Sequence, residues 1–329
     1  MSRGPGSPPS SHSSAACGIM SGMATPCVKW AGGKRRLVPI LESRLPREFG
    51  TYHEPFAGGA ALFLAVQPPK AVLSDANERL IRAYTALRSR PEHVIDLLRG
   101  YPNEAAFFEK MRQRSVLIDG GSDVEVAACF IYLNRTCYGG VYRVNQQNRF
   151  NVPFGRYKNP KICDEALLRS CSKALQGVTL KHATFEEALL AAKRGDFVYA
   201  DPPYLPTSKT SSFTGYTAKG FDLGDHRRLR DLALELAQRG VHVLISNSAA
   251  PEILELYKGP AFHIERITAA RSIGASTSSR CKAEELLISV GPALRVKASK
   301  GAPPRRGAAE RRSRVSAPAR NGTTVSELA

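Results

Sequence analysis

The segment FVYADPPYLP, residues 197–206, places an apolar run directly before a stiff polar loop. Four apolar or small residues precede Asp201, and the first proline after it lacks the N–H that a strand ladder needs. The sequence therefore predicts a buried strand with Asp201, Pro202, Pro203 and Tyr204 at its carboxyl end. Ligands of open α/β sheets bind at that edge, so this loop is a candidate functional site.

The rest of the chain extends the α/β pattern. Apolar runs predict short strands near residue 52, up to Asp75, over 241–248 and near 285–290, and helical spacing predicts helices over 35–44, after 77 and over 225–239. Residues 81–184 interrupt this pattern with helices and then an aromatic, basic and amide-rich stretch around NQQN that predicts a hairpin or long loop. We expect an α/β sheet domain formed by 25–80 and 185–292, with 81–184 inserted.

Charge distinguishes this chain from an average globular protein. It has 47 Lys and Arg against 29 Asp and Glu, a net charge of +18 and a pI of about 9.8, which favours a polyanionic partner. The Ser/Gly/Pro-rich start, 1–24, and the basic end, 293–329, read as disordered. The basic end is either a nonspecific nucleic-acid arm or a solvated tail.

Cysteines and hydropathy narrow the class further. The seven cysteines are irregularly spaced and form no C-x-x-C pair, which argues against a disulfide framework or a zinc site and fits a reducing cytoplasm. No apolar run reaches the roughly 20 residues of a membrane span. We therefore expect a cytoplasmic protein without a metal and without membrane contact.

The segment EPFAGGAAL adds a glycine loop between a predicted strand and helix. Phe56 and Gly58 lie in this loop, and Asp75 ends the next strand, where a carboxylate suits ribose hydroxyls. The dinucleotide fingerprint G-x-G-x-x-G does not fit, because GAAL follows Gly58. The P-loop does not fit either, because Arg35 follows Gly33-Lys34 where Ser or Thr is required. The loop indicates a nucleoside ligand, with NAD and simple tight packing as the alternatives.

The four residues after the strand suit chemistry on an exocyclic ring amine. The amine's lone pair is delocalised, and acceptors on both N–H groups would localise it; Asp201 and the Pro202 carbonyl can be those acceptors. Tyr204 offers a stacking face, worth roughly 1–3 kcal/mol per base, and a base reaches such a pocket by flipping out of the duplex. The alternative is a Pro-Pro turn with a capping Asp and a core Tyr.

Six motifs occur in the order seen in Dam-type (D12 class) DNA adenine N6-methyltransferases: KWAGGK (29–34), EPFAGGA (54–60), SDAN (74–77), LNR…NRFNVPFGRYKNP (133–160), DPPY (201–204) and LISN (244–247). The sequence resembles this family over about residues 25–291. The resemblance implies a Rossmann-like methyltransferase sheet, S-adenosylmethionine as cofactor, and an inserted helical and β-hairpin domain that recognises DNA.

The resemblance also implies site residues. The cofactor would be bound by Trp30, Lys34, Phe56, Gly58, Asp75 and Asp201, and the catalytic loop would be Asp201, Pro202, Pro203 and Tyr204. One departure is Ala60, which stands where the family has a second glycine. We expect its methyl group to fit with φ below zero, with slightly altered cofactor affinity and no loss of activity.

The hairpin segment resembles the family's target-recognition region. Arg143 stands where the family has an arginine that reads guanine, a pairing that bidentate hydrogen bonds explain. The expected DNA contacts are Lys29, Arg135, Tyr142, Arg143, Asn145 and Pro153; Arg149, Arg156, Lys158 and Lys161 are phosphate contacts or solvated charges. A basic loop within 271–288 is a further candidate clamp on the backbone.

The function that this resemblance implies is methyl transfer to N6 of adenine in a short duplex DNA site, with GATC as the expected sequence. We expect a monomer in a bacterial or phage setting, with double-stranded DNA as partner and a cognate restriction endonuclease acting separately. Two alternatives stay open: methylation of N4 of cytosine or of an RNA amine, and a catalytically silent DNA-binding module.

Overall fold

The computed structural model describes residues 24–117, 120–205, 220–269 and 283–292, all within one compact unit of the chain. The expected tail 293–329, nearly all of the expected extension 1–24, and most of the basic 271–288 loop lie outside the described residues. None of the described helices is long and apolar enough to cross a membrane.

A seven-stranded mixed sheet forms the centre of the fold, in the order β3-β2-β1-β4-β5-β7-β6. The first five strands in that order are parallel, whereas β7 runs antiparallel to both β5 and β6. The strands are β1 (Tyr52–Glu54), β2 (Ala71–Asp75), β3 (Thr179–His182), β4 (Phe197–Ala200), β5 (His242–Ser248), β6 (His263–Ala269) and β7 (Ala283–Val290).

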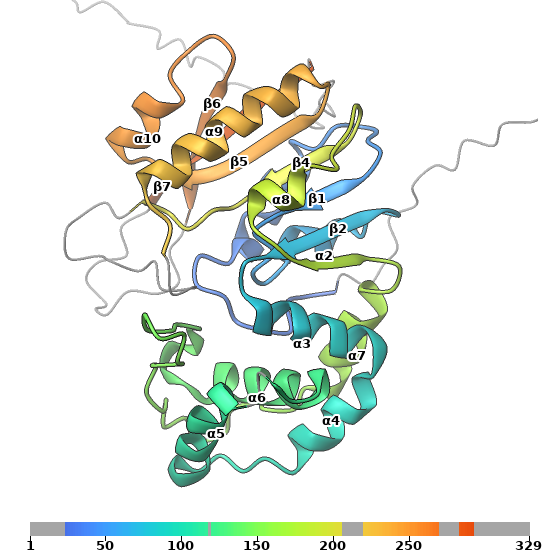
Figure 1. The fold of residues 1–329 in the computed structure, drawn as a ribbon, viewed down its shortest axis with the longest axis vertical. Coiled ribbons are helices and arrows are strands. Elements are labelled where there is room, and N and C mark those ends of the chain that lie inside the picture. Colours follow the sequence, from blue (N-terminus) through green and yellow to red (C-terminus); the bar gives the residue numbers. More distant parts are fainter. Residues whose placement is uncertain (1–23, 118–119, 206–219, 270–282, 293–329) are drawn as a thin grey trace, which may run out of the picture. The chain divides into compact units, whose positions relative to one another are not determined.

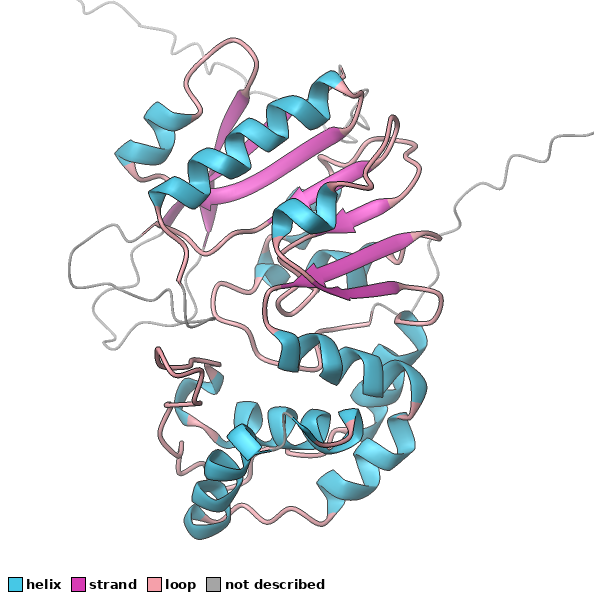
Figure 2. Cartoon of the chain, in the orientation of Figure 1, coloured by secondary structure: helices cyan, strands magenta, loops and turns pink. Residues whose placement is uncertain are grey.

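Helices precede, separate and follow these strands, as Figure 1 and Figure 2 show. They are η1 (Lys34–Arg36), α1 (Val38–Glu42), α2 (Ala61–Val66), α3 (Glu78–Ser89), α4 (Pro91–Arg99), α5 (Ala105–Leu117), α6 (Asp123–Thr136), η3 (Tyr138–Gly140), α7 (Glu165–Ala174), α8 (Phe185–Leu189), α9 (Leu223–Gln238) and α10 (Pro251–Leu256). The predicted helix over 35–44 is confirmed in part, as η1 followed by the short α1.

Two hydrophobic cores cover the two faces of the sheet. Strand β4 shows the alternation: Phe197 and Tyr199 pack with α1, α2 and the helices α3–α7, whereas Val198 and Ala200 pack with α8, α9 and α10. Successive side chains of a strand point to opposite faces, and both faces are covered, so all four residues are buried. This explains why the FVYA run is continuously apolar or small.

The order of the strands creates a switch point between β1 and β4. From β1 the chain continues through α2 to β2 on one side, while β4 pairs with β5 on the other. Crevices at such a point, outside the carboxyl ends of parallel strands, are where open α/β sheets bind ligands. Glu54 ends β1 and Asp201 follows β4, so the glycine loop and the DPPY loop meet at this edge.

Helices α3–α7 occupy the chain between β2 and β3 and lie on the β2 side of the sheet in Figure 1. Within the expected insertion, 81–184, residues 179–182 form β3 and pair in parallel with β2. This strand is largely exposed at the edge of the sheet, so its sequence TLKH shows no apolar alternation. After α6 and η3 the chain forms the predicted hairpin, with an antiparallel bridge between Val144 and Phe150.

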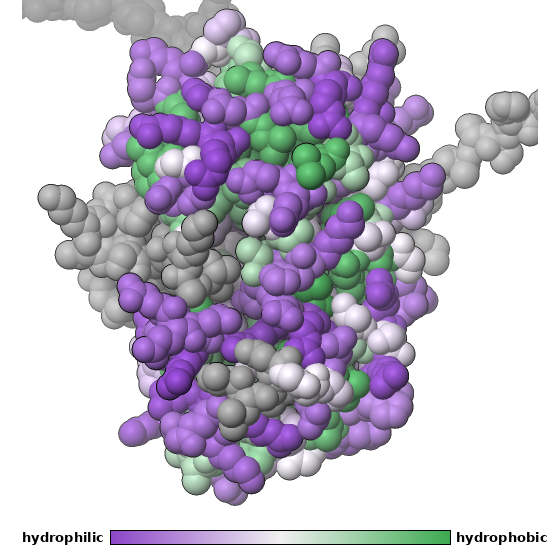
Figure 3. All heavy atoms as spheres, viewed as in Figure 1, coloured by the Kyte–Doolittle hydropathy of each residue, from purple (hydrophilic) through white to green (hydrophobic). Residues whose placement is uncertain are grey.

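Polar and charged residues cover most of the face seen in Figure 3, with hydrophobic residues in small groups between them. Among the described residues, the exposed large hydrophobic side chains are Tyr138, Tyr157 and Leu190. Two of the three, Tyr138 and Tyr157, belong to the hairpin region.

Candidate active site

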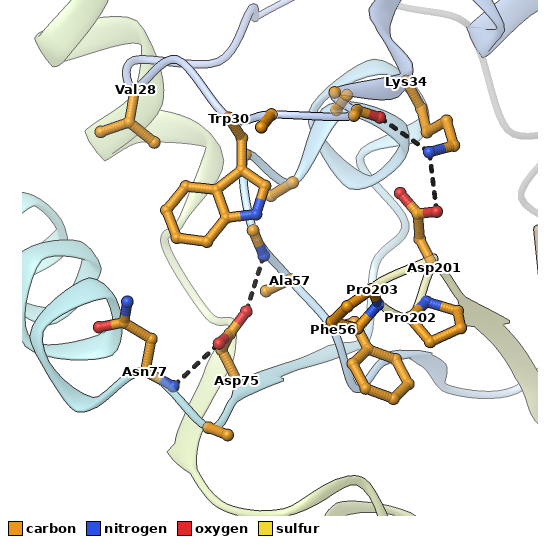
Figure 4. A pocket seen from close by; sticks show the side chains of 18 of the residues that line it. Val28, Trp30, Lys34, Phe56, Ala57, Asp75, Asn77, Asp201, Pro202 and Pro203 are labelled. Carbon is orange, nitrogen blue, oxygen red and sulfur yellow. Dashed lines mark hydrogen bonds and ion pairs between the residues drawn. The ribbon is translucent and has the colours of Figure 1, made fainter. Parts of the chain in front are cut away.

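Asp75 is fixed by the backbone at the end of β2. Its Oδ2 accepts the N–H of Gly58 at 2.9 Å, and its Oδ1 accepts the N–H of Asn77 at 2.9 Å (Figure 4). Asn77 in turn caps α3 by accepting the N–H of Leu80 at 3.1 Å. Burial raises the pKa of Asp75 to about 6. The glycine loop and the acid that the sequence paired are therefore joined directly.

Gly58 is required by its surroundings as well as by its backbone. Its φ is +44°, and a Cβ at this position would lie 2.7 Å from the Trp30 indole. The indole is stacked on Tyr142, with 5.9 Å between ring centroids and 10° between ring planes. The Tyr84 hydroxyl donates to the Gly58 carbonyl at 2.6 Å. The loop and Trp30 thus form one packed wall of the site.

Ala60 departs from the conformation that we expected. Its φ is +51°, in the left-handed region, so the prediction of a negative φ is wrong. The loop must turn tightly to begin α2 at Ala61, and the N–H of Ala60 closes this turn on the Ala57 carbonyl at 2.6 Å. A side chain in the left-handed region costs roughly 1–2 kcal/mol, so Ala60 carries strain that glycine would avoid.

Glu54, which the sequence did not single out, also lines the site. It is 3% exposed, and its Oε2 accepts the Tyr52 hydroxyl at 2.8 Å. Burial raises the pKa of Glu54 to about 8, and the negative charge of Asp201 adds to the shift. The signal in the sequence that could have identified Glu54 was its position directly before Pro55 and Phe56 of the glycine loop.

Asp201 is anchored through one oxygen. Its Oδ1 is 2.8 Å from Lys34 Nζ and 2.7 Å from Ser246 Oγ, which donates to it. Lys34 is only 5% exposed, and its ammonium also donates to the Gly32 carbonyl at 2.7 Å (Figure 4). Burying an unpaired ammonium costs free energy, so the ion pair with Asp201 stabilises the buried Lys34.

Two contacts fix Tyr204, one at its hydroxyl and one over the face of its ring. Its hydroxyl donates to Glu285 Oε2 at 2.8 Å, and Lys34 Nζ lies 4.6 Å from the ring centroid. Burial, together with the charges of Asp201 and Glu285, raises the pKa of Tyr204 far above its ordinary value. The phenol therefore stays protonated and keeps its hydrogen bond. Pro202 and Pro203 line the same site.

These groups surround one cavity of about 1680 Å³. Its walls include Trp30, Phe56, Glu54, Asp75 and Asp201 together with the whole DPPY loop. Phe56 stacks on Phe185, with 5.5 Å between centroids, and Phe221 meets it edge-on at 5.6 Å. Aromatic walls, a carboxylate at the end of β2 and acidic groups at the switch point fit a cationic nucleoside such as S-adenosylmethionine.

The hairpin that follows η3 borders the same cavity. Arg143, Pro153 and Arg135 line it, and Lys29 is exposed near Tyr157, with Nζ 5.3 Å from the ring centroid. Arg143 Nε donates to Asn151 Oδ1 at 2.8 Å, which fixes the direction of the guanidinium. Asn145 instead closes the turn, since its Oδ1 accepts the N–H groups of Gln147 and Arg149, both at 3.0 Å.

Two residues predicted to contact DNA, Tyr142 and Arg135, have partners within the protein. Tyr142 is 3% exposed, and its ring packs between Trp30 and Phe130, so the expectation of a surface contact is not supported. Arg135 is half-buried and donates to the Cys27 carbonyl at 2.6 Å. The alternation of aromatic and basic residues in this segment does not indicate which aromatic rings point into the core and which point to the surface. Tyr138, which the sequence did not single out, is 68% exposed at the cavity.

The family described as D12 class N6 adenine-specific DNA methyltransferase matches residues 30–273 of the chain. The type II methyltransferase M1.LlaDCHI of Lactococcus lactis subsp. cremoris is 45% identical over 269 residues, which are 80% of this chain and 94% of that protein. The type II methyltransferase M.MjaIII of Methanocaldococcus jannaschii is 37% identical over 275 residues, covering 78% and 94%.

The DNA adenine methylase of Vibrio cholerae serotype O1 is 34% identical over 275 residues, which are 81% of this chain and 96% of that protein. The family match over residues 30–273 includes the glycine loop, the hairpin, the DPPY loop and strands β1–β6, and the relatives are covered over 94–96% of their length. The chain belongs to the D12 class of N6 adenine-specific DNA methyltransferases and is a site-specific adenine DNA methyltransferase.

Proposed function

We propose that this enzyme methylates N6 of an adenine that has been flipped out of a short duplex site, with GATC as the recognised sequence. Family membership implies S-adenosylmethionine as the methyl donor. The observation that carries the proposal is the arrangement of Asp201: one carboxylate oxygen is anchored by Lys34 and Ser246, beside a tyrosine ring and the glycine loop.

Asp201 and Pro202 act on the target amine. The Asp201 carboxylate accepts one N–H and the Pro202 carbonyl accepts the other, which localises the nitrogen lone pair for attack. Proline φ angles are fixed near −65°, so the carbonyl stays in place while the reaction proceeds. The contribution of these groups is positioning and electrostatic stabilisation, with no covalent intermediate on the protein.

Tyr204 and Pro203 hold the extruded base. The Tyr204 ring provides a stacking face, worth roughly 1–3 kcal/mol, and the bond to Glu285 keeps the ring from rotating away. Because Lys34 lies over one face of the ring, the base must stack on the opposite face or displace the ammonium.

The cofactor is held by the wall opposite the DPPY loop. The donor supplies an electrophilic methyl group on a sulfonium. Asp75 accepts hydrogen bonds from its ribose hydroxyls, Phe56 and Gly58 lie along the nucleoside, and Trp30 and Lys34 lie at the methionine end. Asp201 lies between donor and acceptor. Glu54, at the end of β1, offers a carboxyl group beside the ligand.

The hairpin reads the DNA. Arg143 pairs with a guanine in the major groove, and Asn151 orients its guanidinium by accepting the Nε–H. Lys29 and Pro153 contact the bases or backbone beside it, and Arg149, Arg156, Lys158 and Lys161 hold phosphates. Residues 81–184 without strand β3 form the recognition domain, and the basic 293–329 tail adds salt-dependent affinity.

The setting of the enzyme follows from its relatives. Two of them are named type II methyltransferases, which supports a cognate restriction endonuclease that acts separately on the same site. One chain contains both the catalytic loop and the recognition hairpin at one cavity, and we infer that the enzyme acts as a monomer on double-stranded DNA.

Sequencing of modified bases in DNA from a methylation-free host that carries the gene tests the proposal. We expect N6-methyladenine at every GATC site, and unmodified DNA from a host that carries the Asp201→Asn variant. Methyladenine in another motif would correct the sequence specificity alone. N4-methylcytosine, or unmodified DNA with well-folded wild-type enzyme present, would overturn the proposed reaction.

A further inference from the structure

We propose that Ser246 is a positioning residue for methyl transfer: with Tyr199 it orients the Asp201 carboxylate so that Oδ2 receives the target amine. The proposal rests on the function proposed above and adds the group that sets the geometry of Asp201. Ser246 does not line the cavity, so its effect must pass through Asp201.

Adjacent strands bring Ser246 to Asp201. Strands β4 and β5 are parallel neighbours, and Ala200 is in register with Ile245, so the next residues on the two strands face each other. Ser246 is fully buried, and Tyr199, two residues before Asp201, is 1% exposed. The Ser246 Oγ lies 2.7 Å from Asp201 Oδ1 and 3.0 Å from the Tyr199 hydroxyl.

Tyr199, Ser246 and Asp201 form a chain of two hydrogen bonds, which we call the relay, and the number of hydroxyl protons fixes its direction. A serine hydroxyl has one hydrogen, and Ser246 donates it to Asp201. Its contact with Tyr199 must then be accepted from the phenol, which requires a protonated tyrosine. Burial, followed by the charge of Asp201, raises the pKa of Tyr199 far above its ordinary value, so the phenol keeps its proton. The relay runs from Tyr199 through Ser246 to Asp201.

The relay makes the two oxygens of Asp201 unequal. Oδ1 receives Ser246 Oγ and Lys34 Nζ, whereas no donor from the described parts of the chain reaches Oδ2. Two donors on one oxygen prevent the carboxylate from rotating about its Cβ–Cγ bond. Oδ2 is thus the acceptor that the site offers to an incoming N–H group, and its direction is set by β5.

Three substitutions of Ser246 test this role. Ser246→Ala removes the donor, and we expect the single-turnover rate to fall about 10- to 100-fold, as for the loss of a hydrogen bond to a charged group. Ser246→Thr keeps the hydroxyl and should restore the rate to within about threefold, and Ser246→Cys, a weak donor of similar shape, should be intermediate. The dissociation constants for S-adenosylmethionine and DNA, measured by calorimetry, should stay within about twofold, because the residue touches neither ligand.

Ser43→Ala is the matched control. Ser43 is half-buried and also donates one hydrogen bond, to the Ile40 carbonyl at 2.7 Å, but it follows α1 and does not line the cavity. It should change the thermal midpoint as Ser246→Ala does and leave the rate unchanged. Should Ser246→Ala fail to fold, the Thr and Cys variants carry the test by themselves.

A double-mutant cycle with Tyr199→Phe tests the relay. Tyr199→Phe should lower the rate about three- to tenfold, and adding it to Ser246→Ala should have no further effect, because it acts through the same hydroxyl. Additive losses, a wild-type rate in Ser246→Ala, or a loss explained by weaker ligand binding would overturn the proposal. Wild-type enzyme that methylates no adenine would instead overturn the proposed function.

Discussion

The DPPY edge and the hairpin that follows η3 border the same cavity but are held in different ways. At the DPPY edge, the fixing contacts join residues far apart in sequence, as in Lys34 to Asp201 and Tyr204 to Glu285. In the hairpin, the side chains of Asn145 and Arg143 bond locally, to residues within eight positions. Its backbone and core ring are held from outside, since Arg79 donates to the Asn148 carbonyl and Trp30 stacks on Tyr142.

This difference matches the two tasks. Chemistry needs groups held within fractions of an ångström, and long-range bonds among buried residues provide this. The proposed recognition needs side chains that can meet bases and waters, and the Arg143 guanidinium bonds only to Asn151 within the hairpin. The comparison predicts that damage at the first region lowers the rate at unchanged affinity, whereas damage at the second changes the choice of sequence.

The largest expected effect is from Asp201→Asn. The amide keeps an oxygen for Lys34 and Ser246, so its nitrogen must take the place of Oδ2 and meets the target amine donor to donor. We expect single-turnover methyl transfer to fall roughly 10³-fold or more, with DNA affinity retained. Asp231→Asn, an exposed change on α9, is the control. Turnover near the wild-type rate would remove Asp201 from the catalytic role.

Glu54→Gln tests the electrostatics of the same region. The pKa of Glu54 is raised from 4.5 to about 8 by burial, so the stabilisation from its neutral form is complete below about pH 4.5 and is lost as the pH rises towards 8. The variant has no charge to bury. Its unfolding free energy should therefore gain on the wild type by about 1.4 kcal/mol per pH unit across that window.

Urea unfolding of the cofactor-free proteins at several pH values measures this gain. The exposed Glu48→Gln variant is the control, and its unfolding free energy should follow that of the wild type. If the Glu54→Gln curve also ran parallel to the wild type, Glu54 would be ionised in the folded protein.

Arg143→Ala addresses the hairpin. Loss of a bidentate arginine should reduce discrimination at one guanine by about 1–3 kcal/mol, with the rate on the original site less affected than by Asp201→Asn. Arg149→Ala, an exposed change in the same hairpin, should weaken binding to all sequences equally. The measurement is the ratio of kcat/KM on cognate and single-substituted duplexes. An unaltered ratio for Arg143→Ala would place base reading elsewhere.

The smallest effect is expected from Ala60→Gly. Glycine accepts φ of +51° without the side-chain penalty, so the unfolding free energy should rise by about 0.5–1 kcal/mol. Ala65→Gly, inside α2, should lower it by about 1 kcal/mol. A loss of stability in both variants would show that Ala60 is not strained.

The sequence predicted the strands and loops that have strong local signals. The apolar FVYA run, the prolines after Asp201 and the glycines before α2 each have one dominant local cause, and the structure brings them together. Strand β3 was missed because an exposed edge needs no apolar alternation, and residues 251–256 and 263–269 were not predicted as α10 and β6.

Side-chain partners were predictable only in part. The pair of Gly58 and Asp75 follows from adjacent parallel strands, whereas the contacts of Ser246 and Glu285 with the DPPY loop depend on the register of β5 and β7. Tyr142 lies in an aromatic and basic segment typical of a DNA-binding surface, but its side chain is buried in the core. Ala60 adopts a backbone conformation that only the tertiary turn explains.

The position of Glu285 late in the chain determines when the Tyr204 contact can form during synthesis. It comes from β7, the last of the described strands along the chain, yet it is the residue that holds the Tyr204 hydroxyl. A ribosome-bound chain that has not yet released β7 already contains Asp201 and the glycine loop, but its Tyr204 hydroxyl has no clamp. The clamp therefore forms only after β7 has joined the sheet.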